Sequence, residues 1–306
     1  MALPNQPKVT ENSRLMPAEL AKTGAQPTSG FKSIFVGPNG LRAGWRVLIF
    51  EALFYGLFVV ANLVRYGGPQ GIREAYRQQQ MGKVALTPLS ILKGFGIAFV
   101  LVCLVTLIMG RFEHRKFSEY GLPFRKALRK DFWVGWGSGF LAIGGTLLAM
   151  FLLHGYRITG AALHGTAIVS AVGAWGMAFL LTALVEEFME RGYIQYTLTT
   201  GIGFWPAALV TSVSFTLGHI ANPQETVVGL AVIVLFGLLL CLFLQRTGNL
   251  WCAVGFHAGW DFGQVFYGVP DSGVPPYHSV FNSSFQGPFF RRVNRAFGSH
   301  PFQLGQ

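Results

Sequence analysis

Long hydrophobic runs alternate with shorter polar segments along most of this 306-residue chain. Each run of about 20 residues is almost free of Lys, Arg and Asp, and a helix of that length crosses the hydrocarbon core of a bilayer. The pattern therefore predicts an all-α, polytopic transmembrane helical bundle of about seven spans, with six to eight as the range. The predicted helices cover about 45–64, 91–110, 132–153, 167 onward, 205–220, 226–245 and 250–269.

The fourth run differs from the others because it leads directly into the polar sequence EEFMERGY. We expect this helix to continue through that sequence to about Leu198. At about 1.5 Å per residue such a helix is longer than one bilayer crossing. Its acidic residues would then lie partway along it.

The polar segments divide the chain into three regions. Residues 1–43 are basic, with little apolar periodicity, and predict a flexible tail. Residues 44–269 hold the predicted transmembrane helices, with a polar connection at about 65–90. Residues 270–306 form a Pro, Gly and Ser-rich C-terminal tail in which no run has spanning length.

Composition supports a membrane protein and sets its expected orientation. Hydrophobic residues make up 51% of the chain and charged residues only 12%, whereas soluble domains average about 25% charged. The net charge of +11 is concentrated between spans, most of all in residues 111–130, and no aromatic and basic reading motif accompanies it. We expect lipid as a partner and no nucleic acid, and the positive-inside rule predicts that this loop and the N-terminus are cytoplasmic.

Ionisable residues in the second half of the chain are the candidates for chemistry, because a charge in hydrocarbon persists only when it is paired or useful. Glu187 and Arg191 are four residues apart, which places them on one helical face in the favourable order for an ion pair. Glu186 lies about 100° around the helix and lacks that partner. The pair could equally be a structural staple at a helix end.

Two further polar sites follow in the next hydrophobic runs. Phe215 and His219 are four apart in SFTLGHIANP, and His257 and Asp261 share a face in LWCAVGFHAGWDFG. Taken singly, His219 could be a hydrogen-bonded packing residue, and the pair of His257 with Asp261 could be an interhelical clamp. Taken together, three polar sites in consecutive spans predict a wet cavity inside the bundle.

The order and spacing of these residues resemble a known family. The run from Glu186 to Arg191 resembles the EExxxR motif of the CPBP family, also called Abi or type II CAAX prenyl endopeptidases. Phe215 to His219 resembles the family's FxxxH motif, and the pair His257 and Asp261 resembles its HxxxN or HxxxD motif. The resemblance implies a bacterial intramembrane protease with its core at about 132–269.

The resemblance also implies roles for individual residues. Glu186 and His219 would hold and activate a water, and His257 with Asp261 would stabilise the oxyanion. Ionised Asp261 can only accept a hydrogen bond, so it would either be protonated or orient His257, of which we favour the second. Glu187 and Arg191 would support the site.

The metal content of such a site stays open at this point. Glu186, His219 and His257 could provide the three protein ligands of a catalytic divalent metal such as zinc. The chain has no HExxH motif, however, and the family pattern also allows a metal-free water activated by glutamate. We favour the metal-free form.

Three functions fit these residues. The first is an endopeptidase in the bacterial plasma membrane, acting near the cytoplasmic boundary on a prenylated, leader-bearing or otherwise membrane-delivered peptide. The second is a non-catalytic member of the same family, acting as a bacteriocin-immunity or regulatory scaffold. The third is a transporter that uses Glu and His as a proton relay. The complete set of Glu and His residues favours the enzyme.

Overall fold

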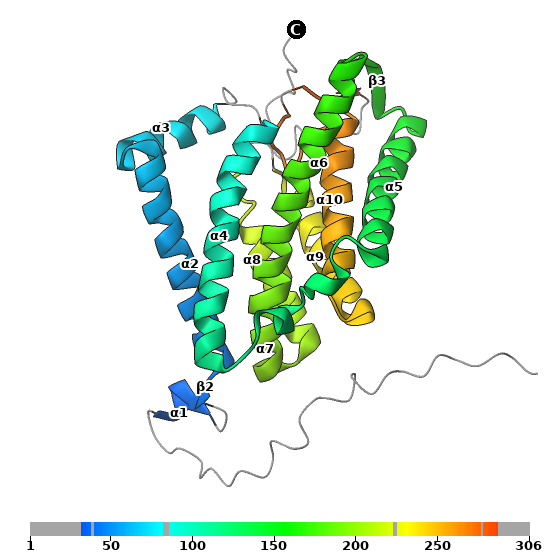
Figure 1. Ribbon diagram of the computed structural model, residues 1–306. Helices are drawn as coiled ribbons and strands as arrows, with labels where there is room; N and C mark the ends of the chain where they lie inside the picture. Colours follow the sequence, from blue (N-terminus) through cyan, green and yellow to red (C-terminus); the bar gives the residue numbers. More distant parts are fainter. Residues whose placement is uncertain (1–31, 38–39, 82–85, 223–224, 277, 287–306) are drawn as a thin grey trace, which may run out of the picture.

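The computed structural model describes residues 32–37, 40–81, 86–222, 225–276 and 278–286, and shows a bundle of long helices that run side by side (Figure 1). The predicted all-α class is confirmed, because most of the described chain is helical and no large sheet occurs in it. The helices are α1 (Lys32–Phe35), α2 (Ala43–Tyr66), α3 (Pro69–Gln80), α4 (Pro88–Glu113), α5 (Lys130–Leu152), α6 (Thr166–Glu187), α7 (Gln195–Ile202), α8 (Phe204–Leu217), α9 (Val227–Thr247) and α10 (Trp251–Phe266).

Five helical runs among the described residues are long and apolar enough to cross a membrane: α2, α4, α5, the run Thr166–Ile202, and α9. Every segment predicted as a span is helical, but the count of seven spans is not confirmed. Helix α8 has only 14 residues, about 21 Å, and α10 has only 16. The predicted spans 205–220 and 250–269 are longer than these helices, because the structure places the last residues of each span in turns.

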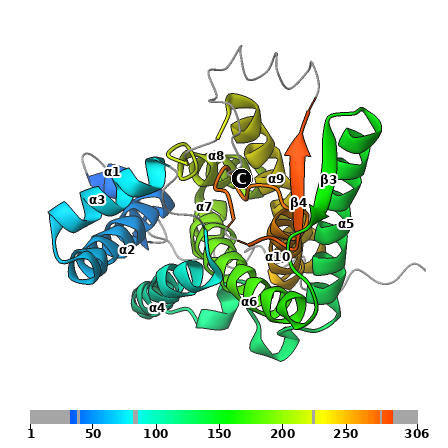
Figure 2. The same ribbon diagram turned by 90° about the horizontal axis from the view of Figure 1, so that it is seen from above.

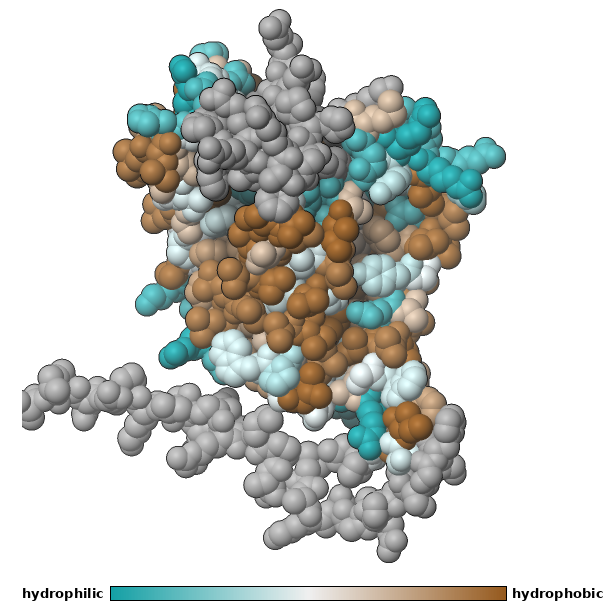
Figure 3. Space-filling model, turned by 180° about the vertical axis from the view of Figure 1, so that it is seen from behind, coloured by the Kyte–Doolittle hydropathy of each residue, from teal (hydrophilic) through white to brown (hydrophobic). Residues whose placement is uncertain are grey.

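The surface of the bundle matches a lipid environment. Figure 3 shows apolar side chains gathered across the middle of one face, with hydrophilic side chains toward both ends. Large exposed apolar side chains occur on several spans, such as Val64 at 80% and Leu141 at 72% exposure. In water such a surface would drive association, so the chain is an integral membrane protein.

The predicted continuation of the fourth helix is confirmed. The helical run Thr166–Ile202 has 37 residues, which corresponds to about 55 Å. It is not a uniform α-helix, because residues Phe188–Ile194 form a π-helical segment directly after the acidic pair. A π-segment changes the direction of the side chains that follow it, and such segments are often found at functional sites.

Helices α5 and α10 touch backbone to backbone through glycines. A Cβ atom on Gly139 would lie 2.1 Å from the Phe256 carbonyl oxygen, and one on Gly259 would lie 2.1 Å from that of Trp136. Gly135 and Gly255 make equivalent approaches, so each helix presents glycines four residues apart, the spacing that lets membrane helices approach closely. This contact fixes α10, which is the most deeply buried helix of the bundle.

Two regions expected to be irregular contain regular structure. The polar connection at 65–90 holds α3, and residues 32–41 include α1 and the short strands β1 (Val36–Gly37) and β2 (Gly40–Leu41). Part of the C-terminal tail is also ordered, because β4 (Phe281–Phe285) pairs antiparallel with β3 (Tyr156–Ala161) in the α5–α6 connection. The sequences of β3 and β4 are too short and too polar to be distinguished from loops. The rest of both tails, 1–31 and 287–306, lies outside the described residues.

Candidate active site

His257 lies at the centre of the predicted site and contacts three carboxylates. Its Nδ1 atom is 2.8 Å from Oε1 of Glu187, and its Nε2 atom is 3.5 Å from Oε2 of Glu186 and 3.3 Å from Oδ2 of Asp261. The first two acids come from α6 and the third from α10. The structure therefore brings four of the predicted site residues into direct contact.

The ion pair expected between Glu187 and Arg191 is present. The Arg191 Nη1 atom donates to Glu187 Oε1 at 3.2 Å, and both side chains are fully buried. The same oxygen accepts the hydrogen bond from His257. Glu187 therefore orients His257 directly. The sequence did not indicate this contact, because the spacing of Glu187 and Arg191 predicted only an ion pair between those two residues.

Space for Arg191 is made by a glycine on α9. A Cβ atom at Gly237 would lie 2.7 Å from the Nη2 atom of Arg191 and 2.8 Å from the Oγ atom of Ser212, so a side chain there would force one of these groups to move. The guanidinium carbon also lies 4.6 Å above the ring of Phe215 on α8. The buried cation is thus held by a carboxylate on one side and an aromatic face on the other.

Phe215 connects the two imidazole rings of the site. Its ring centroid is 4.6 Å from that of His219 and 6.0 Å from that of His257. No hydrogen bond or ion pair joins His219 to Glu186 or His257 within the described residues, and the ring of Phe215 lies next to both histidines. His219 is nevertheless part of the same side-chain cluster.

The hydrogen bond of His219 decides which ring nitrogen is available. Its Nδ1 atom is 2.8 Å from the backbone oxygen of Phe215. A carbonyl oxygen only accepts, so Nδ1 carries the proton and Nε2 of the neutral ring has a free lone pair. The partly exposed His219 side chain can therefore accept a proton or bind a water through Nε2.

Glu186 is the most accessible acid of the cluster. Its side chain is 19% exposed, compared with 7% for Asp261 and none for Glu187. Glu187 is already engaged by Arg191 and His257. Glu186 is therefore the carboxylate best able to reach a water or substrate.

A further carboxylate, Asp271, lies near this cluster and was not predicted. It follows α10 in a tight turn, where Asp271 and Val274 exchange backbone hydrogen bonds. Burial raises the pKa of Asp271 well above its usual range, and the negative charges of Asp261 and Glu186 add to the rise. No sequence pattern indicated this position, because only the return of the chain over the bundle brings it there.

Three connections are tied together beside the His219 end of α8. Asn222 donates to the backbone oxygen of Ser272 at 2.7 Å, and Gln80 donates to that of Ala221 at 2.6 Å. The Leu86 backbone N–H donates to Pro275 at 3.0 Å. Viewed from above, the segment after α10 crosses the middle of the bundle between α8 and α10 (Figure 2).

The arrangement does not form a metal site as it stands. Within the described residues, no group of three or more His, Cys, Asp or Glu side chains is placed to hold a metal ion. Of the ligand set considered from the sequence, Glu186 and His257 are in contact, whereas His219 contacts the ring of Phe215. Both nitrogens of His257 face carboxylates instead. The metal set considered from the sequence stays a hypothesis.

A protein-family model matches part of the chain. Residues 168–263 match the family model of the Rce1-like type II CAAX prenyl endopeptidases. The resemblance noted in the sequence is thereby confirmed over this segment. The Rce1-like segment runs from α6 to α10 and includes Glu186, His219, His257 and Asp261.

The match supports a CAAX-type protease of the membrane with a peptide substrate. No curated protein and no solved structure matches the chain. The individual roles of the residues in the Rce1-like segment stay predictions.

Proposed function

We propose that this chain is an intramembrane endopeptidase that hydrolyses a peptide bond of a membrane-delivered substrate with a water activated by Glu186 and His219. The observation that supports this proposal most directly is the contact between Glu186 and His257. Glu186 is the most accessible acid of the cluster, and Glu187 holds the Nδ1 atom of His257. The Rce1-like match supports the reaction class. A prenylated or leader-bearing peptide in a bacterial plasma membrane, with the basic end of the bundle cytoplasmic, is the setting we propose.

Hydrolysis needs a base for water and donors for the developing oxyanion. In the proposed reaction, Glu186 takes one proton from a water held at Nε2 of His219, and the hydroxide adds to the scissile carbonyl carbon. The oxyanion that forms accepts a hydrogen bond from Nε2–H of His257. The proton on Glu186 then passes to the leaving amine as the carbon–nitrogen bond breaks.

The role of Asp261 follows from the atom it faces. Glu187 already orients His257 through Nδ1, whereas Asp261 lies 3.3 Å from Nε2, the nitrogen that faces Glu186. In the proposal, Asp261 favours the protonated form of His257, so that Nε2 carries a hydrogen for the oxyanion. This replaces the orienting role that the sequence suggested for Asp261.

The first test compares membranes that express the wild type, Glu186→Gln and Glu119→Gln, by mass spectrometry of peptide termini. Glu119 is an exposed acid on the α4–α5 loop and serves as the matched control. Termini produced by the wild type and by Glu119→Gln should disappear in Glu186→Gln. If all three membranes give the same termini, the chain acts as a scaffold or transporter and the protease proposal is wrong.

A second variant separates the two nitrogens of His219. In His219→Asn the side-chain amide can still donate to the Phe215 carbonyl in place of Nδ1, but nothing replaces Nε2. We expect the variant to fold and to lose at least about 100-fold in activity, as for the loss of a general base. Cleavage that persists after dialysis against a chelator would support the metal-free form of the reaction.

A further inference from the structure

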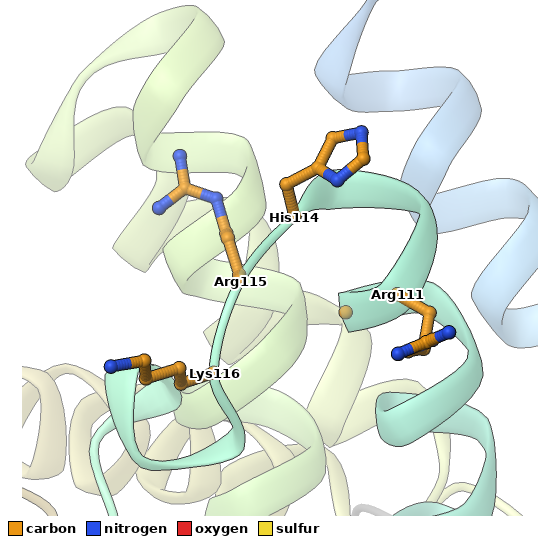
Figure 4. Close-up of a pocket in the computed structure, with 5 residues that line it drawn as sticks. Arg111, His114, Arg115 and Lys116 are labelled. Atoms are coloured by element: carbon orange, nitrogen blue, oxygen red, sulfur yellow. The ribbon is translucent and has the colours of Figure 1, made fainter.

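A basic pocket lies at the end of α4, away from the candidate active site. Helix α4 ends at Glu113, and His114 then adopts a left-handed conformation with φ of 55°, which turns the chain sharply. The turn and the last helical residues border an open surface pocket of about 380 Å³. Its lining is Gly110, Arg111, His114, Arg115 and Lys116 (Figure 4).

The nearest acid neutralises this pocket only in part. The side chain of Glu113 is 6% exposed and is already paired with Arg46 at 3.1 Å and with Arg115 at 3.9 Å. Arg115 also lies over the ring of Tyr196 on α7, which holds it in place. Neither Arg111 nor Lys116 has an acidic partner within the described parts of the chain. The pocket therefore carries uncompensated positive charge.

The surroundings of the pocket are apolar and face outward. On the preceding turns of α4, Leu107 is 52% exposed and Phe112 is 77% exposed. Helix α4 is one of the spans, so these side chains lie against lipid and the cations follow at the end of the span. This is the level of the lipid headgroups, where basic residues and phosphate groups meet.

We propose that the basic pocket binds the headgroup phosphate of an anionic phospholipid, with the acyl chains lying along the exposed side chains of α4. The Arg111 and Lys116 side chains point to opposite sides of the turn in Figure 4, and in the proposal they rotate toward the phosphate on binding. Arg115 stays with Glu113 and Tyr196 and adds positive charge nearby. The open pocket of about 380 Å³ leaves room for a headgroup phosphate while the rest of the lipid stays outside. The lipid would hold the α4–α5 connection against the bundle.

The test uses purified full-length protein in detergent, titrated with short-chain phosphatidylglycerol and followed by native mass spectrometry. Phosphatidylcholine and inorganic phosphate are titrated in parallel. The variant is R111Q/K116Q, and the matched control is R125Q/K126Q, which removes two charges from the same loop outside the pocket. Each basic residue near an anionic lipid contributes a factor of about five in affinity, so the variant should bind phosphatidylglycerol about 25-fold more weakly.

The control should bind phosphatidylglycerol like the wild type, and phosphatidylcholine should bind weakly to all three proteins. Equal losses in variant and control would show general charge attraction and overturn the proposal. If inorganic phosphate displaces the lipid at equal concentration, the site takes a free anion and not a lipid. An unfolding temperature equal to that of the wild type in phosphatidylcholine would show that R111Q/K116Q is folded. If R111Q/K116Q does not fold, the single variant K116Q is tested instead, and it should bind phosphatidylglycerol about fivefold more weakly than the wild type.

Discussion

The glycine contact between α5 and α10 gives the sharpest prediction about this protein. In Gly259→Ala, the new Cβ atom would lie 2.1 Å from the carbonyl oxygen of Trp136, whereas ordinary contacts begin at 3.4 Å. The backbones must therefore separate by about 1.3 Å at this point. His257 lies two residues away on the same helix, so its 2.8 Å contact with Glu187 cannot keep its geometry.

A displacement of about 1 Å in a catalytic group lowers activity by about 100-fold, and overpacking costs about 1–3 kcal/mol of stability. The assays are cleavage of a substrate found in the Glu186→Gln comparison, and thermal unfolding followed by tryptophan fluorescence. Gly137→Ala is the control, because Gly137 lies on α5, the helix that faces Gly259, and a Cβ atom there meets nothing within 4 Å. Equal activity and equal unfolding temperature in Gly259→Ala and Gly137→Ala would refute the argument that close backbone contact positions His257.

Two further predictions concern the charges around the site. Arg191→Met leaves the fully buried Glu187 without its cation, so we expect the free energy of unfolding to fall by about 3–5 kcal/mol. Denaturation in mixed micelles measures this loss, and the double variant Arg191→Met/Glu187→Gln should recover part of it. Asp271 has a raised pKa, so it holds its proton more tightly when folded, and the protein loses stability as the pH rises above the ordinary value of 3.8. Asp271→Asn should therefore unfold at a higher temperature than the wild type at neutral pH and at the same temperature at pH 3, and equal pH profiles of the two proteins would contradict this.

Much of the chemistry was readable from the sequence because it depends on local spacing. Glu187 and Arg191 pair at 3.2 Å, as a separation of four on a helix requires. The continuous apolar runs indicated membrane helices for the same reason, since every backbone group in lipid must be satisfied within its own segment. His257 and Asp261, also four apart, lie on one face and contact each other.

Contacts between distant segments could not be predicted in this way. The hydrogen bond of Glu187 to His257 joins residues that are 70 positions apart, and Asp271 reaches the site only because three connections pack over the bundle. The spacing of four between Gly255 and Gly259 is visible in the sequence. Only the structure shows that glycines of α5 face them, so that the two backbones come into contact.

The sequence by itself determined that the helices are surrounded by lipid, that the fold is helical and which residues are able to carry chemistry. Hydrophobicity and helical periodicity act over a single turn or span, so they can be recognised without the tertiary structure. Only the tertiary structure decided which acid stays accessible and which nitrogen of each histidine is engaged. Burial and hydrogen bonding depend on what the neighbouring helices leave open. Glu186 and Glu187 are adjacent in the chain, yet one is 19% exposed and the other is completely enclosed.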